Sequence, residues 1–201
     1  IGSGKTTIER LILGLYQPSE GAVALDGVDM RQLDPAELRR AIGYVAQDAT
    51  LFYGSLRHNL TLGAPELSDK RILEAAELAG VTEFANRHPQ GFDMPIGERG
   101  ESLSAGQRQA VAIARALVLK PPILVLDEPS SHMDFASEER LKQRLKSFLG
   151  DRTLVLITHR TALLDCVDRL IVLDQGQLIA DGPKDAIMVA LREGRVRGAT
   201  A

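Results

Sequence analysis

The sequence has no tryptophan, a single cysteine, and aromatic residues at only 4% of its 201 positions. With Cys166 alone, no internal disulfide can form, and a reducing compartment fits the chain. No apolar run approaches the roughly 20 residues that are needed to span a bilayer. The longest candidates, Ile123–Leu126 and Leu154–Ile157, have the length of buried strands. If this protein works at a membrane, we therefore expect another segment or another chain to span it.

The sequence also lacks a large excess of either positive or negative residues. The chain carries 24 Lys and Arg residues against 27 Asp and Glu residues, and the two signs are well mixed. This balance argues against a nucleic-acid-binding surface, so we expect no nucleic-acid partner. The hydrophobic content of 44% is enough to bury a core, either as one domain or as one domain with a lobe.

Short apolar strands alternate with amphipathic helices along the chain. The predicted strands are Ala22–Leu25, Ile42–Ala46, Ile123–Leu126, Thr153–Thr158, Arg169–Leu173 and Gln177–Ala180. The predicted helices are Thr6–Tyr16, Pro35–Arg40, Ser68–Ala79, Ser104–Leu119 and Ala136–Leu149. Strands that alternate with helices in this way predict an α/β fold with a mostly parallel sheet and helices on both faces.

The middle of the chain differs from its two ends. Strand signals stop between Asp48 and about Leu103, where the helical pattern of Ser68–Ala79 dominates. Ile72, Ala75, Ala76 and Ala79 fall on one face of that helix. We therefore expect a core made of residues 1–47 and 110–201, with a helical subdomain of residues 48–109 inserted into it.

The first residues have the pattern of a phosphate-binding loop. The run from Gly2 to Thr7 ends as G-x-x-x-x-G-K-[ST] ends, and the first glycine of that pattern would precede Ile1. Glycines let successive backbone N–H groups point at one phosphate, and the helix that follows adds the positive end of its dipole. Lys5 supplies a charge for the β- and γ-phosphates, and Thr6 offers a hydroxyl to Mg²⁺. We expect a nucleoside triphosphate site and a chain that begins inside its own motif; a glycine turn with a surface lysine is the alternative.

Two acids follow a predicted strand. Asp127 and Glu128 come directly after the apolar run Ile123–Leu126. Ligands of parallel α/β sheets bind beyond the carboxyl ends of the strands. Asp127 therefore suits the Mg²⁺ shell, and Glu128 can polarise an attacking water as a general base. The alternative is a solvated acidic turn before Pro129.

A second anion-binding helix end is predicted at Ser104. Ser104 and Gln107 have the spacing of a capping box at the start of a good helix. A helix N-terminus that carries Ser and Gly is also an anion site. Two such ends on one chain favour a head-to-tail dimer with nucleotide between the copies.

In this order, the motifs resemble those of an ATP-binding cassette (ABC) ATPase. The corresponding segments are Gly2–Thr7 for the Walker A end, Gln47 for the Q-loop glutamine, Leu103–Gln107 for the signature, Ile123–Asp127 for the Walker B strand, Ser131–Asp134 for the D-loop and His159 for the switch histidine. The resemblance covers almost the whole chain. It implies a P-loop NTPase fold of the RecA-like type that is truncated at its N-terminus.

The resemblance also implies roles for single residues. Glu128 would activate water, His159 would hold the γ-phosphate, Gln47 would sense Mg²⁺, and Lys5 would complete the catalytic set. The implied ATP-binding residues are Gly2, Ser3, Gly4, Lys5, Thr6, Thr7, Gln47, Ser104, Ala105, Gly106, Gln107 and Asp134. Those implied for Mg²⁺ are Thr6, Gln47 and Asp127.

The branch of the family is indicated by shorter segments. Gly97–Gly100 resembles the X-loop of ABC exporters, although a charged turn between glycines is the simpler interpretation. His88–Asp93 and Thr158–Thr161 resemble the ATPase parts of bacterial type I exporters that move adhesins or RTX proteins. This implies a second cassette as partner, and a transmembrane domain on the same full-length chain that contacts the Gln47 and Gly97–Gly100 regions. The implied location is the cytoplasmic face of the bacterial inner membrane.

Two departures from the family pattern leave alternatives open. Ala105 replaces the first glycine of the signature pair, which is strained only if its φ is positive. His132 stands where a smaller residue is usual. A soluble ABC ATPase that acts on DNA or ribosomes and a cassette that does not hydrolyse ATP are the two other hypotheses. The stretch between Lys5 and Ser104 is too short for the long coiled coil of the DNA-repair types.

Overall fold

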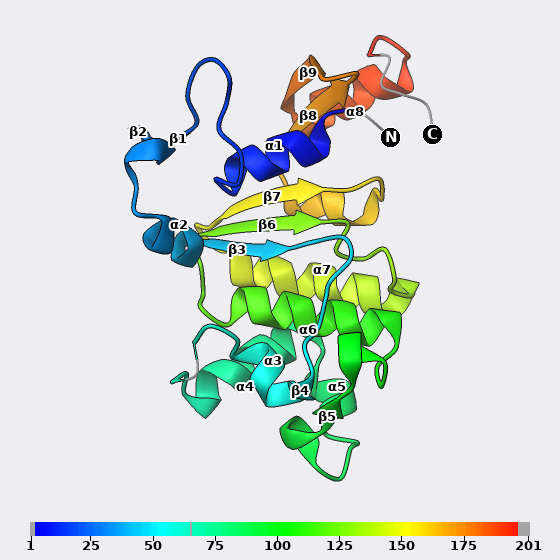
Figure 1. The fold of residues 1–201 in the computed structure, drawn as a ribbon. Coiled ribbons are helices and arrows are strands. Elements are labelled where there is room, and N and C mark those ends of the chain that lie inside the picture. The colour runs from blue at the N-terminus through cyan, green and yellow to red at the C-terminus, as the bar shows by residue number, and fades with distance from the viewer. Residues whose placement is uncertain (1–2, 65, 197–201) are drawn as a thin grey trace. The chain divides into compact units, whose positions relative to one another are not determined.

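A computed structural model describes residues 3–64 and 66–196 (Figure 1). They form two compact units, one from the described parts of residues 1–39 and 167–201 and the other from residues 40–166. The predicted division into a core and a subdomain of residues 48–109 follows other boundaries and remains a prediction. No helix among the described residues combines the length and the apolar character that a membrane span requires.

The larger unit contains a three-stranded parallel sheet (Figure 1). Its strands are β3 (Ile42–Val45), β6 (Ile123–Asp127) and β7 (Thr153–Ile157), with β6 in the centre. Leu124, Val125 and Leu126 are fully buried, as their continuous apolar character predicts. Because all three strands run in parallel, their carboxyl ends lie at one edge of the sheet.

Helices cover one face of this sheet (Figure 1). The two long ones are α6 (Ala105–Leu117) and α7 (Phe135–Leu149). Beyond them lie the helices of the predicted lobe, which are α3 (Leu56–Leu60), α4 (Asp69–Ala79) and α5 (Thr82–Ala85). The α/β fold class is confirmed, whereas helical cover on the second face remains a prediction.

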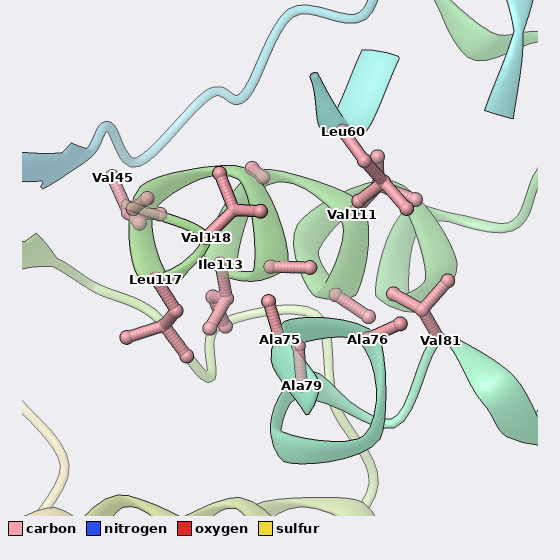
Figure 2. Packing of buried hydrophobic residues seen from close by; sticks show 14 of the residues in the cluster. Val45, Leu60, Ala75, Ala76, Ala79, Val81, Val111, Ile113, Leu117 and Val118 are labelled. Carbon is pink, nitrogen blue, oxygen red and sulfur yellow. The ribbon is translucent and has the colours of Figure 1, made fainter. Parts of the chain in front are cut away.

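The core of the larger unit packs between α4 and α6 (Figure 2). Ala75, Ala76 and Ala79 of α4 turn toward α6, which presents Val111 and Ile113. Side chains as small as alanine let the two helices approach closely, so that the larger residues of α6 fill the space between them. The predicted inner face of this helix is therefore confirmed.

One prediction for the middle of the chain was wrong. No strand was expected between Asp48 and Leu103, yet β4 (Gly54–Ser55) pairs antiparallel with β5 (Pro95–Ile96). Strands of two residues are too short to show alternation in a sequence. Two 3-10 turns, η2 (Gly91–Asp93) and η3 (Glu98–Gly100), complete this region.

The smaller unit combines short helices with two antiparallel ladders. Its helical elements are α1 (Lys5–Ile12), η1 (Met30–Gln32) and α8 (Lys184–Arg192). Helix α2 (Pro35–Ala41) crosses the boundary between the two units. The 3-10 helix η4 (Ala162–Cys166) belongs to the larger unit. The ladders pair β1 (Ala24–Leu25) with β2 (Val28–Asp29), and β8 (Arg169–Asp174) with β9 (Gln177–Pro183).

The local predictions for this unit agree with the structure in type and differ in length. The first helix ends at Ile12 rather than Tyr16, and Gly14 adopts a φ of 67° in the turn that follows. Asp34 accepts a hydrogen bond from the backbone N–H of Ala36 at 2.6 Å and so caps the helix that begins at Pro35.

Adjacent residues of α4 provide a test of the core. Ile72 is 3% exposed and Leu73 is 44% exposed. We expect Ile72→Ala to lower the free energy of unfolding by about 2–5 kcal/mol, because it leaves a cavity in the buried core. Leu73→Ala is the matched control and should change it by less than about 1 kcal/mol. Urea denaturation measures both values, and equal losses would contradict the packing described here.

Candidate functional site

The N-terminal loop has the backbone geometry of an anion site. Gly4 stands at the N-cap of α1 with a φ of 92°, a conformation that favours glycine. A Cβ atom at Gly4 would also lie 3.3 Å from the Cα of Gly176. The Nζ of Lys5 donates to the hydroxyl of Ser3 at 2.8 Å, which places the ammonium group over the loop. Gly2 lies outside the described residues.

The first turn of α1 adds further groups to this loop. Thr6 and Thr7 are exposed there, directly after Lys5. The first N–H groups of a helix have no partner within the helix. The turn therefore offers backbone donors, hydroxyls and an ammonium group to an anion.

A second set of predicted residues shares the carboxyl edge of the parallel sheet. Gln47 follows β3 and is exposed, Asp127 ends β6, and His159 follows β7. Asp127 lies directly opposite Ile157 in the strand register. The sheet thus brings together residues that are more than a hundred positions apart, as the strand arrangement predicts.

Glu128 is held at this edge by several hydrogen bonds. Its φ is 45°, which is uncommon for a residue other than glycine. Its carboxylate accepts hydrogen bonds from the backbone N–H of His159 at 2.7 Å and from the hydroxyl of Thr158 at 3.2 Å. Its own N–H donates to the carbonyl of Ile157 at 2.8 Å. These bonds fix a nearly buried carboxylate in a strained conformation that is typical of functional sites.

The imidazole of His159 lies beside this carboxylate. Its Nε2 atom is 3.9 Å from Oε1 of Glu128, and its side chain is 77% exposed. The two side chains therefore differ in environment, since that of Glu128 is nearly buried while that of His159 faces solvent. An outward-facing imidazole next to a buried carboxylate can contact a ligand that sits on the edge.

Ser104 forms the predicted capping box. Its hydroxyl accepts from the N–H of Gln107 at 3.2 Å, and the side chain of Gln107 accepts from the N–H of Ser104 at 2.8 Å. Ala105 is the first residue of α6 and does not have a positive φ. Its methyl group therefore avoids the strain that a left-handed conformation would impose.

The start of α6 packs against the turn that follows β6. A Cβ atom at Gly106 would lie 3.0 Å from the carbonyl oxygen of His132, so a side chain here would require the turn to shift by a few tenths of an ångström. Asp134 ends the turn and caps α7 by accepting the N–H of Ser137 at 2.7 Å. A cavity of about 500 Å³ opens here, and residues 104–107 and 132–134 contribute to its lining.

The proposed metal ligands have a suitable chemistry. Thr6, Gln47 and Asp127 offer a hydroxyl, an amide oxygen and a carboxylate, which are hard oxygen donors of the type that Mg²⁺ takes. The described part of the chain contains no cluster of three His, Cys, Asp or Glu side chains that could hold a metal alone. Each of these donors by itself is of a type that suits an ion whose other ligands are substrate phosphates.

Some residues of the edge were missed by the sequence analysis. Thr158 was given no role in the site, yet it donates to Glu128. Ser130, Glu138 and Arg160 form a polar cluster behind the edge. A buried acid in the first turn of a helix leaves no local pattern, because its partners are distant in sequence. The segment Gly97–Gly100 forms a turn, and its contact with a membrane domain remains a prediction.

The comparisons with known proteins agree with these observations. A family profile described as "ABC transporter" matches residues 1–131 of the chain. The chain belongs to the ABC transporter family. The resemblance that the motifs indicate is thereby confirmed.

Named relatives of this ABC transporter chain include secretion proteins. It is 40% identical over 189 residues to the cyclolysin secretion/processing ATP-binding protein CyaB of Bordetella pertussis, covering 94% of this chain and 26% of that protein. It is 42% identical over 181 residues to the leukotoxin translocation ATP-binding protein LktB of Mannheimia glucosida, covering 90% and 26%. The chain thus spans about a quarter of the length of these relatives.

A solved structure supports the fold. The structure of a bacterial Atm1-family ABC exporter with ATP bound superposes with a TM-score of 0.88 and 38% sequence identity. The match covers 95% of this chain and 33% of the exporter chain. The P-loop NTPase fold predicted from the sequence is thereby confirmed.

The cap of α7 should make stability depend on pH. The backbone hydrogen bond from Ser137 lowers the pKa of Asp134 below its ordinary value of 3.8. A carboxyl with a lowered pKa contributes stability above its unfolded pKa and loses it as the pH falls through the folded pKa. Asp134→Asn keeps a capping side chain but does not titrate. We expect the thermal midpoint of the wild type to fall relative to that of the variant below about pH 4. A constant difference from pH 7 to pH 2 would contradict this role.

Proposed function

We propose that this chain binds and hydrolyses ATP as the nucleotide-binding part of an ABC exporter. The observation that carries the proposal is the Glu128 carboxylate, which is nearly buried at the end of β6 and held by the N–H of His159. A carboxylate fixed at this edge can accept a proton from an attacking water. Membership of the ABC transporter family supports ATP as the substrate.

The loop residues are assigned to the phosphates. Ser3, Gly4, Lys5, Thr6 and Thr7 bind them through backbone N–H groups, hydroxyls and the ammonium group, and Gly2 belongs to the same loop. The positive charge of Lys5 stabilises the β- and γ-phosphates as negative charge develops.

The edge residues of the larger unit are assigned to hydrolysis. Glu128 orients and deprotonates the water, and the imidazole of His159 donates to the γ-phosphate. Gln47 would contact both the nucleotide and the metal. Mg²⁺ would be held by Thr6, Gln47 and Asp127 together with the phosphates, and would neutralise part of their charge.

The signature end is assigned to a second cassette. Ser104, Ala105, Gly106 and Gln107 present the N-terminus of α6 to the nucleotide of a partner copy, and Asp134 lines the same cavity. Two copies would then bind two ATP molecules between them. Hydrolysis would shift the population back to separated cassettes, because ATP stabilises only the closed pair.

The relatives support an exporter of the type I secretion kind. Their names refer to the secretion of cyclolysin and the translocation of leukotoxin. We propose that the exported substrate is a protein and that the chain works at the cytoplasmic face of the bacterial inner membrane. A transmembrane domain would contact it near Gln47 and Gly97–Gly100.

Two substitutions in the full-length protein separate binding from hydrolysis. We expect Glu128→Gln to lower the rate of ATP hydrolysis by about 10²–10⁴-fold, because it removes the general base. ATP should still bind and should accumulate unhydrolysed on the protein. Lys5→Ala should instead abolish ATP binding, because the phosphates lose their charged ligand. Lys146→Ala, on the exposed side of α7, is the control for a lost lysine charge.

Hydrolysis is measured as phosphate release, and binding as retention of radiolabelled ATP. An unchanged rate in Glu128→Gln would overturn the assignment of the base. A wild-type protein that binds ATP without releasing phosphate would identify a non-hydrolysing cassette.

A further inference from the structure

A buried polar cluster lies behind the Glu128 edge. Ser130 is fully buried, and Glu138, in the first turn of α7, is 6% exposed. The hydroxyl of Ser130 donates to Oε1 of Glu138 at 2.5 Å, and Nη1 of Arg160 lies 3.5 Å from Oε2. Burying an ionised carboxylate lowers the stability of the fold unless positively charged groups or hydrogen-bond donors face it. The cluster has no role in the function proposed above.

Arg160 joins the two loops that border the edge. Its Nη2 donates to the carbonyl oxygen of Ser131 at 3.2 Å, in the turn that follows Glu128. Its backbone N–H donates to the hydroxyl of Thr158 at 3.0 Å, and that hydroxyl donates to Oε2 of Glu128. A continuous series of contacts therefore runs from helix α7 to the carboxylate of Glu128.

We propose that Arg160 and Glu138 are positioning residues for the hydrolytic step, which rests on the proposed hydrolysis of ATP. They hold the loop of residues 158–160 against the turn after Glu128. This fixes both the N–H and the imidazole of His159 relative to the carboxylate that activates water. Neither Arg160 nor Glu138 contacts the reacting atoms, so both act through His159 and Glu128.

The shape of the guanidinium group explains the choice of arginine. Nη1 of the guanidinium group lies near the carboxylate of Glu138, while Nη2 donates to the carbonyl oxygen of Ser131. A lysine has one point charge and does not provide two donors in this fixed geometry. Small displacements matter here, because misplacement of a catalytic group by about 1 Å can cost about a hundredfold in rate.

A merely structural ion pair would behave differently. It would lower the thermal midpoint and reduce the amount of active protein, without changing the properties of the molecules that remain active. A positioning pair instead lowers kcat in folded protein and leaves the KM for ATP nearly unchanged, because the phosphate-binding loop of residues 3–7 is untouched.

The first experiment compares single variants of the full-length protein. We expect Arg160→Gln and Glu138→Gln to lower kcat by about ten- to a hundredfold with KM within about twofold of the wild type. Arg160→Lys should fall between the wild type and Arg160→Gln. Glu139→Gln is the matched control, because the Glu139 side chain is 40% exposed and its carboxylate pairs with Lys142 of the same helix, away from the Glu128 edge. It should leave kcat unchanged.

The second experiment asks whether Arg160 acts through His159. Residues that act as a unit give non-additive losses. We therefore expect the loss of kcat in the double variant His159→Ala/Arg160→Gln to be clearly smaller than the product of the two single losses. A full additional loss would overturn the proposal, and so would a wild-type kcat in folded Arg160→Gln. If Arg160→Gln does not fold, Glu138→Gln and Arg160→Lys decide the question in the same way.

The outcomes separate this inference from the proposed function. If neither Lys5→Ala nor Glu128→Gln lowers the rate of ATP hydrolysis, the proposed function is wrong. Impaired hydrolysis in those two, together with wild-type kcat in the folded Arg160 and Glu138 variants, would overturn the positioning role alone.

Discussion

The hydrogen bond from the backbone N–H of His159 to the carboxylate of Glu128 is the interaction on which the candidate site depends. It spans 2.7 Å and connects the ends of β6 and β7. A hydrogen bond to an ionised acceptor is stronger than one between neutral groups. It forms only because the register places Asp127 opposite Ile157, so that the next residues of both strands meet. A shift of the register by one residue would separate the proposed base from the loop that carries the histidine.

The surroundings of Glu128 show how the fold maintains a strained residue. A positive φ is unfavourable for glutamate, and the next residue is a proline. Three hydrogen bonds compensate for this conformation, two to the carboxylate and one from its own N–H to Ile157. Strain of this kind persists only when the surrounding structure determines the conformation several times over. The loop of residues 158–160 and the first turn of α7 provide that surrounding structure.

Close packing around Gly106 joins the same turn to α6. The carbonyl of His132 approaches Gly106 so closely that a side chain would require a displacement of the turn. The turn that follows Glu128 therefore contacts the N-terminus of α6 on one side and the Arg160 guanidinium on the other. Two segments that are distant from each other in sequence, the start of α6 and the loop of Arg160, are thus held by contacts to one short turn. Proteins place functional residues on such turns because the elements on either side are rigid.

The sequence by itself determined what depends on neighbouring residues. The capping box at Ser104, the inner face of α4 and the order of the motifs all follow from local patterns, and each was predicted. Only the tertiary structure decided the partners of Glu128, the burial of Glu138 beside Arg160, and the pairing of β4 with β5. The physical reason is that hydrogen-bond partners from distant segments leave no periodic signal, and strands of two residues are too short to show one.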